Sequence, residues 1–350
     1  MKYTSHPVIE GPYLRDILDQ PQALQATLDD FRGTADLFDR IEKMQRKEHA
    51  RVVLTGMGSS LHALYPLEMT LTAQGENVTR VDTSELIHSM PILLAESTIV
   101  VAVSQSGRSV EVVRLLEQNA HRATVIGVTN TADSLLAKRA DLLMLTECGD
   151  EFSVSAKTYV GALAALEILG AAWCGEEAGT LYVELQGGPA LMAGYLRGWR
   201  EHVQSLAEEM EKISRLFIVG RGRSLAACGT GALITKESTR SSAEAMSSAA
   251  FRHGPMEMTG PETMVMVLEG EANIRGLNSK LVRDIRDCGG RAELIGPDAE
   301  IPALRIPGQP ARLLPVVEIL PIQMLTLALA ARAGFEAGRF AHATKVTTEE

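Results

Sequence analysis

The sequence predicts an α/β protein of two tandem subdomains, each a parallel sheet flanked by helices in a three-layer sandwich. Two observations lead to this prediction. Apolar, β-rich runs alternate with helical runs along the chain, which is the pattern of parallel sheets covered by helices. A Gly-x-Gly turn also follows a strand twice, at corresponding places in the two halves. With 350 residues, of which 45% are hydrophobic, the chain is long enough for two domains with buried cores.

The first half contains short apolar runs that are expected to form strands. Helical patterns separate these runs, and a long helix over Ser153–Trp173 is expected to follow them. The expected strands are Arg51–Thr55, Val78–Asp82, Thr98–Ser104, Ala123–Val128 and Asp141–Thr146.

The second half begins after a looser stretch, Gly175–Gly188. Its expected strands are Arg215–Gly220, Thr263–Leu268 and Arg291–Ile295, and its expected helices are Ser224–Arg240, Ile274–Cys288 and Leu313–Ala333. Pro315 and Pro321 are expected to kink or offset the last helix. The predicted domains are an N-terminal helical segment (1–34), a first subdomain (35–175), a linker (176–198), a second subdomain (199–334) and a C-terminal tail (335–350).

The two halves echo each other and then differ. Residues 55–60, Thr-Gly-Met-Gly-Ser-Ser, have a counterpart 164 residues later in Val-Gly-Arg-Gly-Arg-Ser at 219–224. By the same offset Ser104 corresponds to Leu268, which is followed by Glu269 and Glu271. Because these carboxylates would repel a phosphate, we expect only the first half to bind an anion.

A segment with three serine hydroxyls follows the apolar residues 98–103. Its sequence is Ser104-Gln105-Ser106-Gly107-Arg108-Ser109. A helix is expected over 109–118. Hydroxyls and free backbone N–H groups would meet where that helix begins, which suits a dianionic phosphate. The run is neither a Walker motif nor a complete Gly-x-Gly-x-x-Gly, so we expect a small phosphorylated ligand rather than a nucleotide.

Composition excludes several other classes of function. The net charge of −10, with a pI of about 5.4 and mean hydropathy of +0.04, is typical of a soluble metabolic protein and argues against nucleic acid or membrane as partners. No stretch of apolar residues indicates a membrane span, and the N-terminus does not resemble a signal peptide. The four cysteines are far apart, so we expect free thiols in a reducing cytoplasm and no metal site.

Two segments of the second half could move protons. Glu237 lies on the helix after the second Gly-x-Gly turn, and His253 lies in Arg-His-Gly-Pro, which is expected to form a turn. A carboxylate and an imidazole suit proton transfer near neutral pH. Taken alone, however, Glu237 could be a solvated helix residue and His253 a turn residue with a satisfied hydrogen bond.

Several short segments, in the same order along the chain, resemble the double sugar-isomerase (SIS) domain family, and within it the isomerase half of glucosamine-fructose-6-phosphate aminotransferases. These segments are 14–21, 58–60, 104–107, 151–159, 236–238, 253–255, 321–325 and 345–350. The resemblance implies two flavodoxin-like SIS subdomains. It further implies that the phosphate and the sugar are bound by Ser60, Ser104, Gln105, Ser106, Ser109 and Val154.

The resemblance also implies the catalytic groups. Glu237 would carry a proton between C1 and C2 of the sugar, and His253 would assist ring opening from the neighbouring subunit of a homodimer. Lys345 would contact the C2 region and form a Schiff base. This chain has Lys2 where the family aminotransferase carries its nucleophilic cysteine, so we expect no glutaminase chemistry. Ile234 and the segment 339–344 also depart from the family pattern, which weakens the case for full amination and leaves room for a different sugar.

The function expected from these residues is a phosphosugar isomerase or deaminase. It would convert glucosamine 6-phosphate to fructose 6-phosphate and ammonia, or catalyse a related aldose–ketose interconversion or transamination, without metal or organic cofactor. One alternative is a deglycase acting on a fructosamine 6-phosphate. Another is a non-catalytic sugar-phosphate sensor, against which Glu237, His253 and Lys345 argue because a sensor need not keep a proton shuttle.

Overall fold

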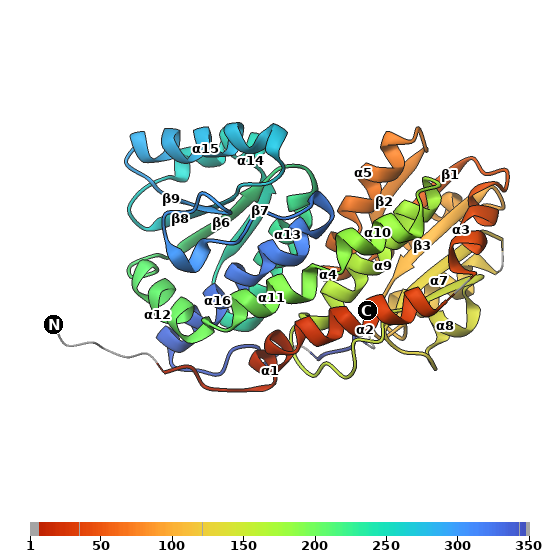
Figure 1. Ribbon diagram of the computed structural model, residues 1–350, viewed down its shortest axis with the longest axis horizontal. Helices are drawn as coiled ribbons and strands as arrows, with labels where there is room; N and C mark the ends of the chain where they lie inside the picture. Colours follow the sequence, from red (N-terminus) through yellow and green to blue (C-terminus); the bar gives the residue numbers. More distant parts are fainter. Residues whose placement is uncertain (1–6, 35, 121, 343, 348–350) are drawn as a thin grey trace. The chain divides into compact units, whose positions relative to one another are not determined.

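The computed structural model describes residues 7–34, 36–120, 122–342 and 344–347, and the chain divides into two compact units (Figure 1). The first unit consists of Gln22–Glu151, Ser155–Gly187 and His342–Glu350. The second unit consists of Met1–Pro21, Phe152–Val154 and Gly188–Ala341. Residues 1–6 of the predicted N-terminal helical segment and residues 348–350 of the predicted tail lie outside the described residues. Each unit therefore draws on segments that are distant in the sequence.

The sheet of the first unit has five parallel strands in the order β2-β1-β3-β4-β5. This is the flavodoxin-like order, in which the direction of strand addition across the sheet reverses at the pair β1/β3. All residues of the central strand β3 are buried, as expected for a strand covered on both faces. The strands are β1 (Arg51–Gly56), β2 (Val78–Asp82), β3 (Thr98–Val103), β4 (Thr124–Thr129) and β5 (Leu142–Leu145).

Helices cover this sheet on its two faces. Alternate strand residues such as Val100 and Ala102 pack in one core cluster with residues of α6, α7 and α8, while α9 packs on α3, α4 and α5. The helices of this unit are α2 (Gln20–Gly33, which begins in the second unit), α3 (Leu37–Gln45), α4 (Ser59–Ala63), α5 (Tyr65–Ala73), α6 (Thr83–His88), α7 (Val110–Asn119), α8 (Leu135–Arg139), α9 (Lys157–Trp173) and α10 (Ala178–Leu185), with the 3₁₀ turn η1 (Pro91–Leu93).

The second unit repeats the arrangement with four parallel strands in the order β7-β6-β8-β9. The strands are β6 (Arg215–Gly220), β7 (Ala243–Ser247), β8 (Thr263–Leu268) and β9 (Arg291–Ile295). The helices are α1 (Pro12–Leu18), α11 (Gly188–Leu196), α12 (Trp199–Glu209), α13 (Leu225–Thr239), α14 (Ser248–Arg252), α15 (Ala272–Asp287) and α16 (Leu314–Ala333). Short 3₁₀ turns are η2 (Gly222–Ser224), η3 (Pro255–Met258), η4 (Pro302–Leu304) and η5 (Ala311–Leu313).

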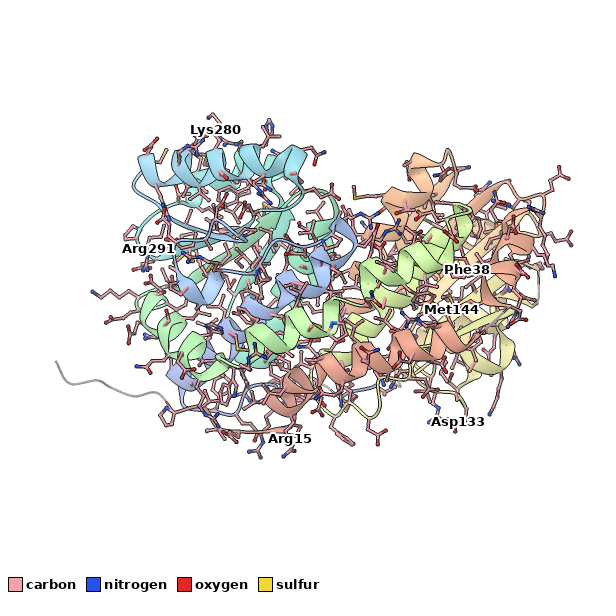
Figure 2. The ribbon with its side chains drawn as sticks, viewed as in Figure 1. Arg15, Phe38, Asp133, Met144, Lys280 and Arg291 are labelled. Carbon is pink, nitrogen blue, oxygen red and sulfur yellow. The ribbon has the colours of Figure 1, made fainter. Side chains whose placement is uncertain are left out.

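The helix α16 forms the centre of the second unit. It packs on α11, α12 and α13, and Pro321 lies inside it without ending it. Among the described residues, the segment Ala311–Ala333 alone is long and apolar enough to cross a membrane. Because 94% of its apolar window is buried inside the protein, the segment is accounted for as a core helix. Charged side chains such as Lys280 of α15 lie instead on the exposed outer side (Figure 2).

The prediction of an α/β protein with two parallel sheets is confirmed, and the expected strands match within about one residue at each end. Three local expectations were wrong. The stretch Gly175–Gly188 is largely helical, because Leu181, Tyr182 and Leu185 give α10 a buried stripe. The long helix begins at Lys157 rather than Ser153. The strand β7 was missed because its sequence, Ala-Glu-Ala-Met-Ser, is short and lies at the sheet edge with only its first residue buried.

Candidate active site

The turn that follows β3 is built from its own serines. The Ser104 hydroxyl accepts a hydrogen bond from the Gly107 N–H at 3.1 Å, and the Ser106 hydroxyl accepts one from the Arg108 N–H at 3.2 Å. Gly107 has a φ of +57°, and a Cβ placed on it would lie 2.4 Å from Ser134 Oγ. Only glycine fits this position, since any other side chain would be both strained and in collision with Ser134.

The same turn is fastened to the end of the neighbouring strand β4. The Gln105 carbonyl accepts hydrogen bonds from the Asn130 N–H at 3.0 Å and from the Thr129 and Thr131 hydroxyls, each at 3.2 Å. These three donors fix the backbone of the turn. The serine hydroxyls are therefore presented on a rigid support, as a binding site requires.

The helix α7 begins directly after this turn. Ser109 is its N-cap residue but makes no side-chain capping bond, so its hydroxyl remains free to serve a ligand. The N–H of Val110 donates to the Thr347 carbonyl at 3.1 Å, which places the C-terminal tail across the start of the helix. The N-terminal end of a helix of this length carries a partial positive charge that favours an anion.

Around this turn lies a cavity of about 200 Å³. It brings together the five residues expected to bind phosphate and the lysine of the tail. These lining residues are Ser60, Ser104, Gln105, Ser106, Ser109 and Lys345. Ser60 comes from α4, after β1, and the others come from the β3–α7 turn and the tail. The carboxyl ends of the parallel strands β1 and β3 thus open on one site, as is usual where strand order reverses.

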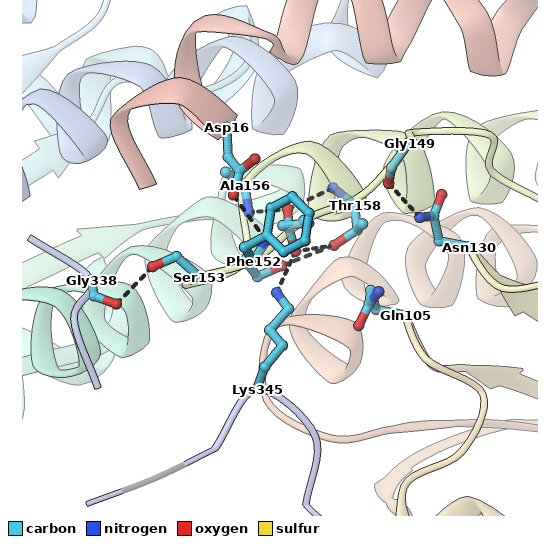
Figure 3. A network of polar contacts seen from close by, with 12 residues as sticks. Asp16, Gln105, Asn130, Gly149, Phe152, Ser153, Ala156, Thr158, Gly338 and Lys345 are labelled. Carbon is cyan, nitrogen blue, oxygen red and sulfur yellow. Dashed lines mark hydrogen bonds and ion pairs between the residues drawn. The ribbon is translucent and has the colours of Figure 1, made fainter. Parts of the chain in front are cut away.

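Lys345 forms an ion pair with Glu151 in this unit (Figure 3). Its Nζ lies 2.6 Å from Glu151 Oε2, although the two residues are 194 positions apart in the sequence. The Glu151 side chain is fully buried, whereas that of Lys345 is 24% exposed and lines the cavity. The pair therefore holds a primary amine at the edge of the site, facing the place where a ligand would lie.

Glu151 also organises the start of α9. Its Oε1 accepts hydrogen bonds from the N–H groups of Ala156 at 2.9 Å and Thr158 at 3.1 Å, and its Oε2 accepts one from the Thr158 hydroxyl at 2.8 Å (Figure 3). These bonds hold the residues before Lys157 out of the helix, which explains why α9 begins later than predicted. Sequence analysis assigned no role to Glu151. The signal that could have found it is a carboxylate just upstream of a helix whose N-cap residue, Ala156, has no side-chain oxygen to accept a capping hydrogen bond.

A second carboxylate that sequence reasoning missed lines the same cavity. Glu111 lies in the first turn of α7, is 7% exposed, and has one oxygen with no partner among the described residues. The positive end of the helix favours a carboxylate there. The cavity is therefore a mixed site, with an acid beside the serines as well as the lysine.

The remaining predicted site residues belong to the second unit. Glu237 is half-buried near the end of α13, where the neighbouring Ser238 and Thr239 are buried and bond back to the helix. His253 is exposed just after α14, next to Gly254, whose φ is +130°. Val154 is buried, at 1% exposure. The structure thus groups the residues predicted to bind phosphate with Lys345 in one unit and assigns Glu237, His253 and Val154 to the other.

Comparison with known proteins extends this picture. Residues 45–172 match the family model of the SIS domain. The chain is 26% identical over 352 residues to the glutamine–fructose-6-phosphate aminotransferase (isomerizing) of Pyrococcus horikoshii, covering 96% of this chain and 57% of that protein. Its fold matches the C-terminal domain of glucosamine-fructose-6-phosphate aminotransferase from Francisella tularensis (TM-score 0.82, 19% identity, 97% and 99% of the two chains). It also matches glucosamine-6-phosphate deaminase from Thermotoga maritima (0.78, 18%, 97% and 100%).

Residues 45–172 therefore match an SIS domain. Over nearly its whole length the chain is homologous to the isomerase half of the isomerizing aminotransferases, and it spans just over half the length of the curated relatives it matches. Its structural neighbours share less than a quarter of their residues with it, so they establish the fold and leave the reaction to be argued from the site.

Proposed function

We propose that this protein is a phosphosugar isomerase or deaminase that acts on an amino-hexose 6-phosphate, converting glucosamine 6-phosphate to fructose 6-phosphate and ammonia. The observation that carries the proposal is the cavity at the end of β3, where serine hydroxyls, a helix N-terminus and an ion-paired lysine meet. The homology to the isomerase half of the isomerizing aminotransferases supports the same class of chemistry.

The phosphate is proposed to lie in the turn between β3 and α7. Ser60, Ser104, Gln105, Ser106 and Ser109 would supply hydrogen bonds, and the α7 N-terminus would supply partial positive charge. Binding energy gained at the phosphate would hold the distant C1–C2 bond in place for reaction. The rigid support of the turn suits this anchoring role, since the hydroxyls need not reorganise on binding.

Lys345 is proposed to react with the sugar carbonyl. An amine attacks a carbonyl only after losing a proton; the carbonyl oxygen then leaves as water, and the imine that forms acts as an electron sink until water hydrolyses it and releases the amine. Glu151 Oε2, at 2.6 Å from Nζ, is placed to take that proton and to hold the amine at the cavity edge. Glu151 is thus proposed as the positioning residue for Lys345.

Glu237 is proposed to carry the proton between C1 and C2, and His253 to assist ring opening. Val154 is proposed to line the sugar. The exposure of His253 suits a residue that a neighbouring subunit presents, so we propose a homodimer. The proposed reaction requires no nucleic acid, membrane, metal or organic cofactor. We propose that the enzyme acts in the cytoplasm.

The first prediction concerns substrates. We expect turnover of glucosamine 6-phosphate with release of ammonia, and a loss of at least tenfold in kcat/KM for glucosamine without phosphate. The measurement is free ammonia and fructose 6-phosphate formed under each condition. In Ser106→Ala the KM for the phosphorylated substrate should rise by about tenfold or more, because a hydrogen bond to a charged group is lost. Ser89→Ala, at the exposed end of α6, is the matched control and should leave KM unchanged.

The alternatives give different outcomes in the same assay. Release of glucose 6-phosphate from a fructosamine 6-phosphate, with no ammonia from glucosamine 6-phosphate, would identify a deglycase. Tight binding of a hexose 6-phosphate without turnover of either compound would identify a sensor. Each of these outcomes would refute the proposed deaminase reaction.

A second prediction concerns Glu151. We expect Glu151→Gln to lower kcat by about tenfold or more while KM changes little, because the variant loses the ion pair with Lys345 but leaves the serines in place. In a double-mutant cycle with Lys345→Met, the double variant should be no slower than Lys345→Met alone. Glu76→Gln, which removes a carboxylate paired with His49 in the same unit, is the control. Additive losses in the cycle would show that Glu151 does not act through Lys345.

A further inference from the structure

A second cavity, of about 220 Å³, lies in the second unit at the carboxyl ends of β8 and β9. It occupies the place that corresponds to the serine cavity of the first unit, where the repeated sequence carries glutamates instead of serines. Neither the phosphate nor the proton-moving groups of the proposed reaction use it. The inference drawn from this cavity does not rest on the proposed function.

The charge of the lining excludes an anionic ligand. Glu269, Glu271 and Glu318 line the cavity, and Arg275 is the one basic residue among the described lining residues. Arg275 Nε is 2.7 Å from Glu269 Oε1, so this cation is already paired. Glu271, the N-cap residue of α15, makes no side-chain capping bond and lies 3.5 Å from Arg223. Both arginines are therefore already neutralised, which leaves no unpaired cation among the described lining residues to hold a phosphate or carboxylate, whereas Glu318 has no basic partner there.

Glu318 supplies an independent sign of a missing partner. Its side chain projects from the core helix α16 and is 1% exposed. Its Oε1 accepts a hydrogen bond from Ser224 Oγ at 2.9 Å, but its Oε2 has no hydrogen-bond partner among the described residues, and the residue lines the cavity. Gln309 Oε1, also in the lining, is likewise buried without a partner there. Buried acceptors of this kind are rare in folded proteins and call for a donor.

Size and chemistry then narrow the class of ligand. The volume corresponds to roughly seven water molecules, which suits a compound of few non-hydrogen atoms. Ile306 and Leu314 provide apolar wall beside the acids. No group of three metal-ligating His, Cys, Asp or Glu side chains occurs in the described part of the chain, which argues against a metal ion. We propose that this cavity binds a small primary amine, whose ammonium group lies between Glu318 and Glu271.

The protonation of Glu318 gives the site a measurable signature. Burial raises the pKa of Glu318 to about 8, with Ser224 and the Gly270 N–H opposing the shift and the carboxylates of Glu271 and Glu269 adding to it. The Cys228 thiol on α13 also interacts electrostatically with Glu318, and its pKa is likewise raised by burial. At pH 7 an arriving ammonium ion would favour the carboxylate of Glu318, which would release its proton to solvent.

The experiment measures binding of ethanolamine to the full chain by calorimetry at pH 7, in two buffers of different ionisation enthalpy. We expect saturable binding with release of up to one proton, and no binding of ethylene glycol, in which a hydroxyl replaces the ammonium. Glu318→Gln should weaken ethanolamine binding by at least tenfold and abolish proton release. Glu271→Gln, on the cavity rim, should weaken it without altering the proton release. Glu244→Gln, an exposed carboxylate on β7, is the charge-matched control and should bind as the wild type does.

Three results would overturn the proposal. The first is the absence of saturable ethanolamine binding at concentrations up to tens of millimolar. The second is binding of ethylene glycol as tight as that of ethanolamine. The third is unchanged ethanolamine binding in both glutamate variants. Activity of the enzyme is not the readout, so the outcome is separate from that of the proposed reaction. The Glu271 variant keeps the test decisive should Glu318→Gln fold poorly.

Discussion

Replacing Glu237 with glutamine is expected to lower kcat by about 10²–10⁴-fold while binding of the sugar phosphate is retained. A single carboxylate above the C1–C2 bond can remove a proton from one carbon and return it to the other, and positioned bases of this kind contribute a factor of that size. A thousandfold loss corresponds to about 4 kcal/mol of transition-state stabilisation. Glutamine preserves the volume of the half-buried side chain on α13, so the fold should not change.

The measurement pairs turnover of glucosamine 6-phosphate with exchange of the C1 proton of fructose 6-phosphate in D₂O. Both should fall together in Glu237→Gln, because both require the same base. Lys236→Gln, the exposed neighbour on the same helix, is the control and should retain both rates. A Glu237 variant with turnover within threefold of the wild type would remove this residue from the reaction.

The free energy of unfolding of the second unit is expected to fall as the pH rises from 5 to 9, and Glu318→Gln should prevent much of that fall. The pKa of Glu318 is about 8 in the folded protein, against 4.5 for an ordinary glutamate. A raised carboxyl pKa means that the folded state keeps a proton that the unfolded state releases. Its stabilising contribution is therefore complete below about pH 4.5 and is lost as the pH approaches 8, with a magnitude on the order of a few kcal/mol.

Urea unfolding at pH 5, 7 and 9 checks this prediction. The chain has two tryptophans, Trp173 in the first unit and Trp199 in the second, so Trp173→Phe leaves a fluorescence signal from the second unit alone. In the Trp173→Phe background, the free energy of unfolding of Glu318→Gln minus that of the parent should increase as the pH rises. The same difference for Glu244→Gln should not change with pH. A difference that stays constant from pH 5 to 9 would contradict the buried, protonated state of Glu318.

Sequence periodicity was sufficient for most of the fold because parallel strands covered by helices are almost wholly apolar. The runs that form β3 and β8 are buried along their full length, so hydrophobicity alone located them. The edge strand β7 was not found, because half-exposed edge strands lack that signal. The helix α10 was not predicted because glycines, which have low helix propensity, surround it. Its buried stripe is short and gave too weak a helical pattern to offset them.

The candidate site divides in the same way. The serine turn is local: Ser104, Ser106 and Gly107 are close in sequence, and their hydrogen bonds form within that turn. Its existence could therefore be predicted from residue types and spacing, and phosphate binding by it stays a prediction. The Lys345–Glu151 pair joins positions 194 apart, and no sequence pattern indicates which of many carboxylates a distant lysine will meet. The same holds for Glu318, whose unpartnered oxygen exists only because α16 and the end of β8 are packed together.

By itself, then, the sequence determined the two parallel sheets and the serine turn after β3, because each depends on local periodicity or on neighbouring residues. The tertiary structure alone decided that the C-terminal tail lies across the start of α7, that Glu151 holds Lys345, and that the glutamates of the second half enclose a cavity. These features depend on contacts between residues far apart in the chain, which form only when the apolar cores bring their elements together.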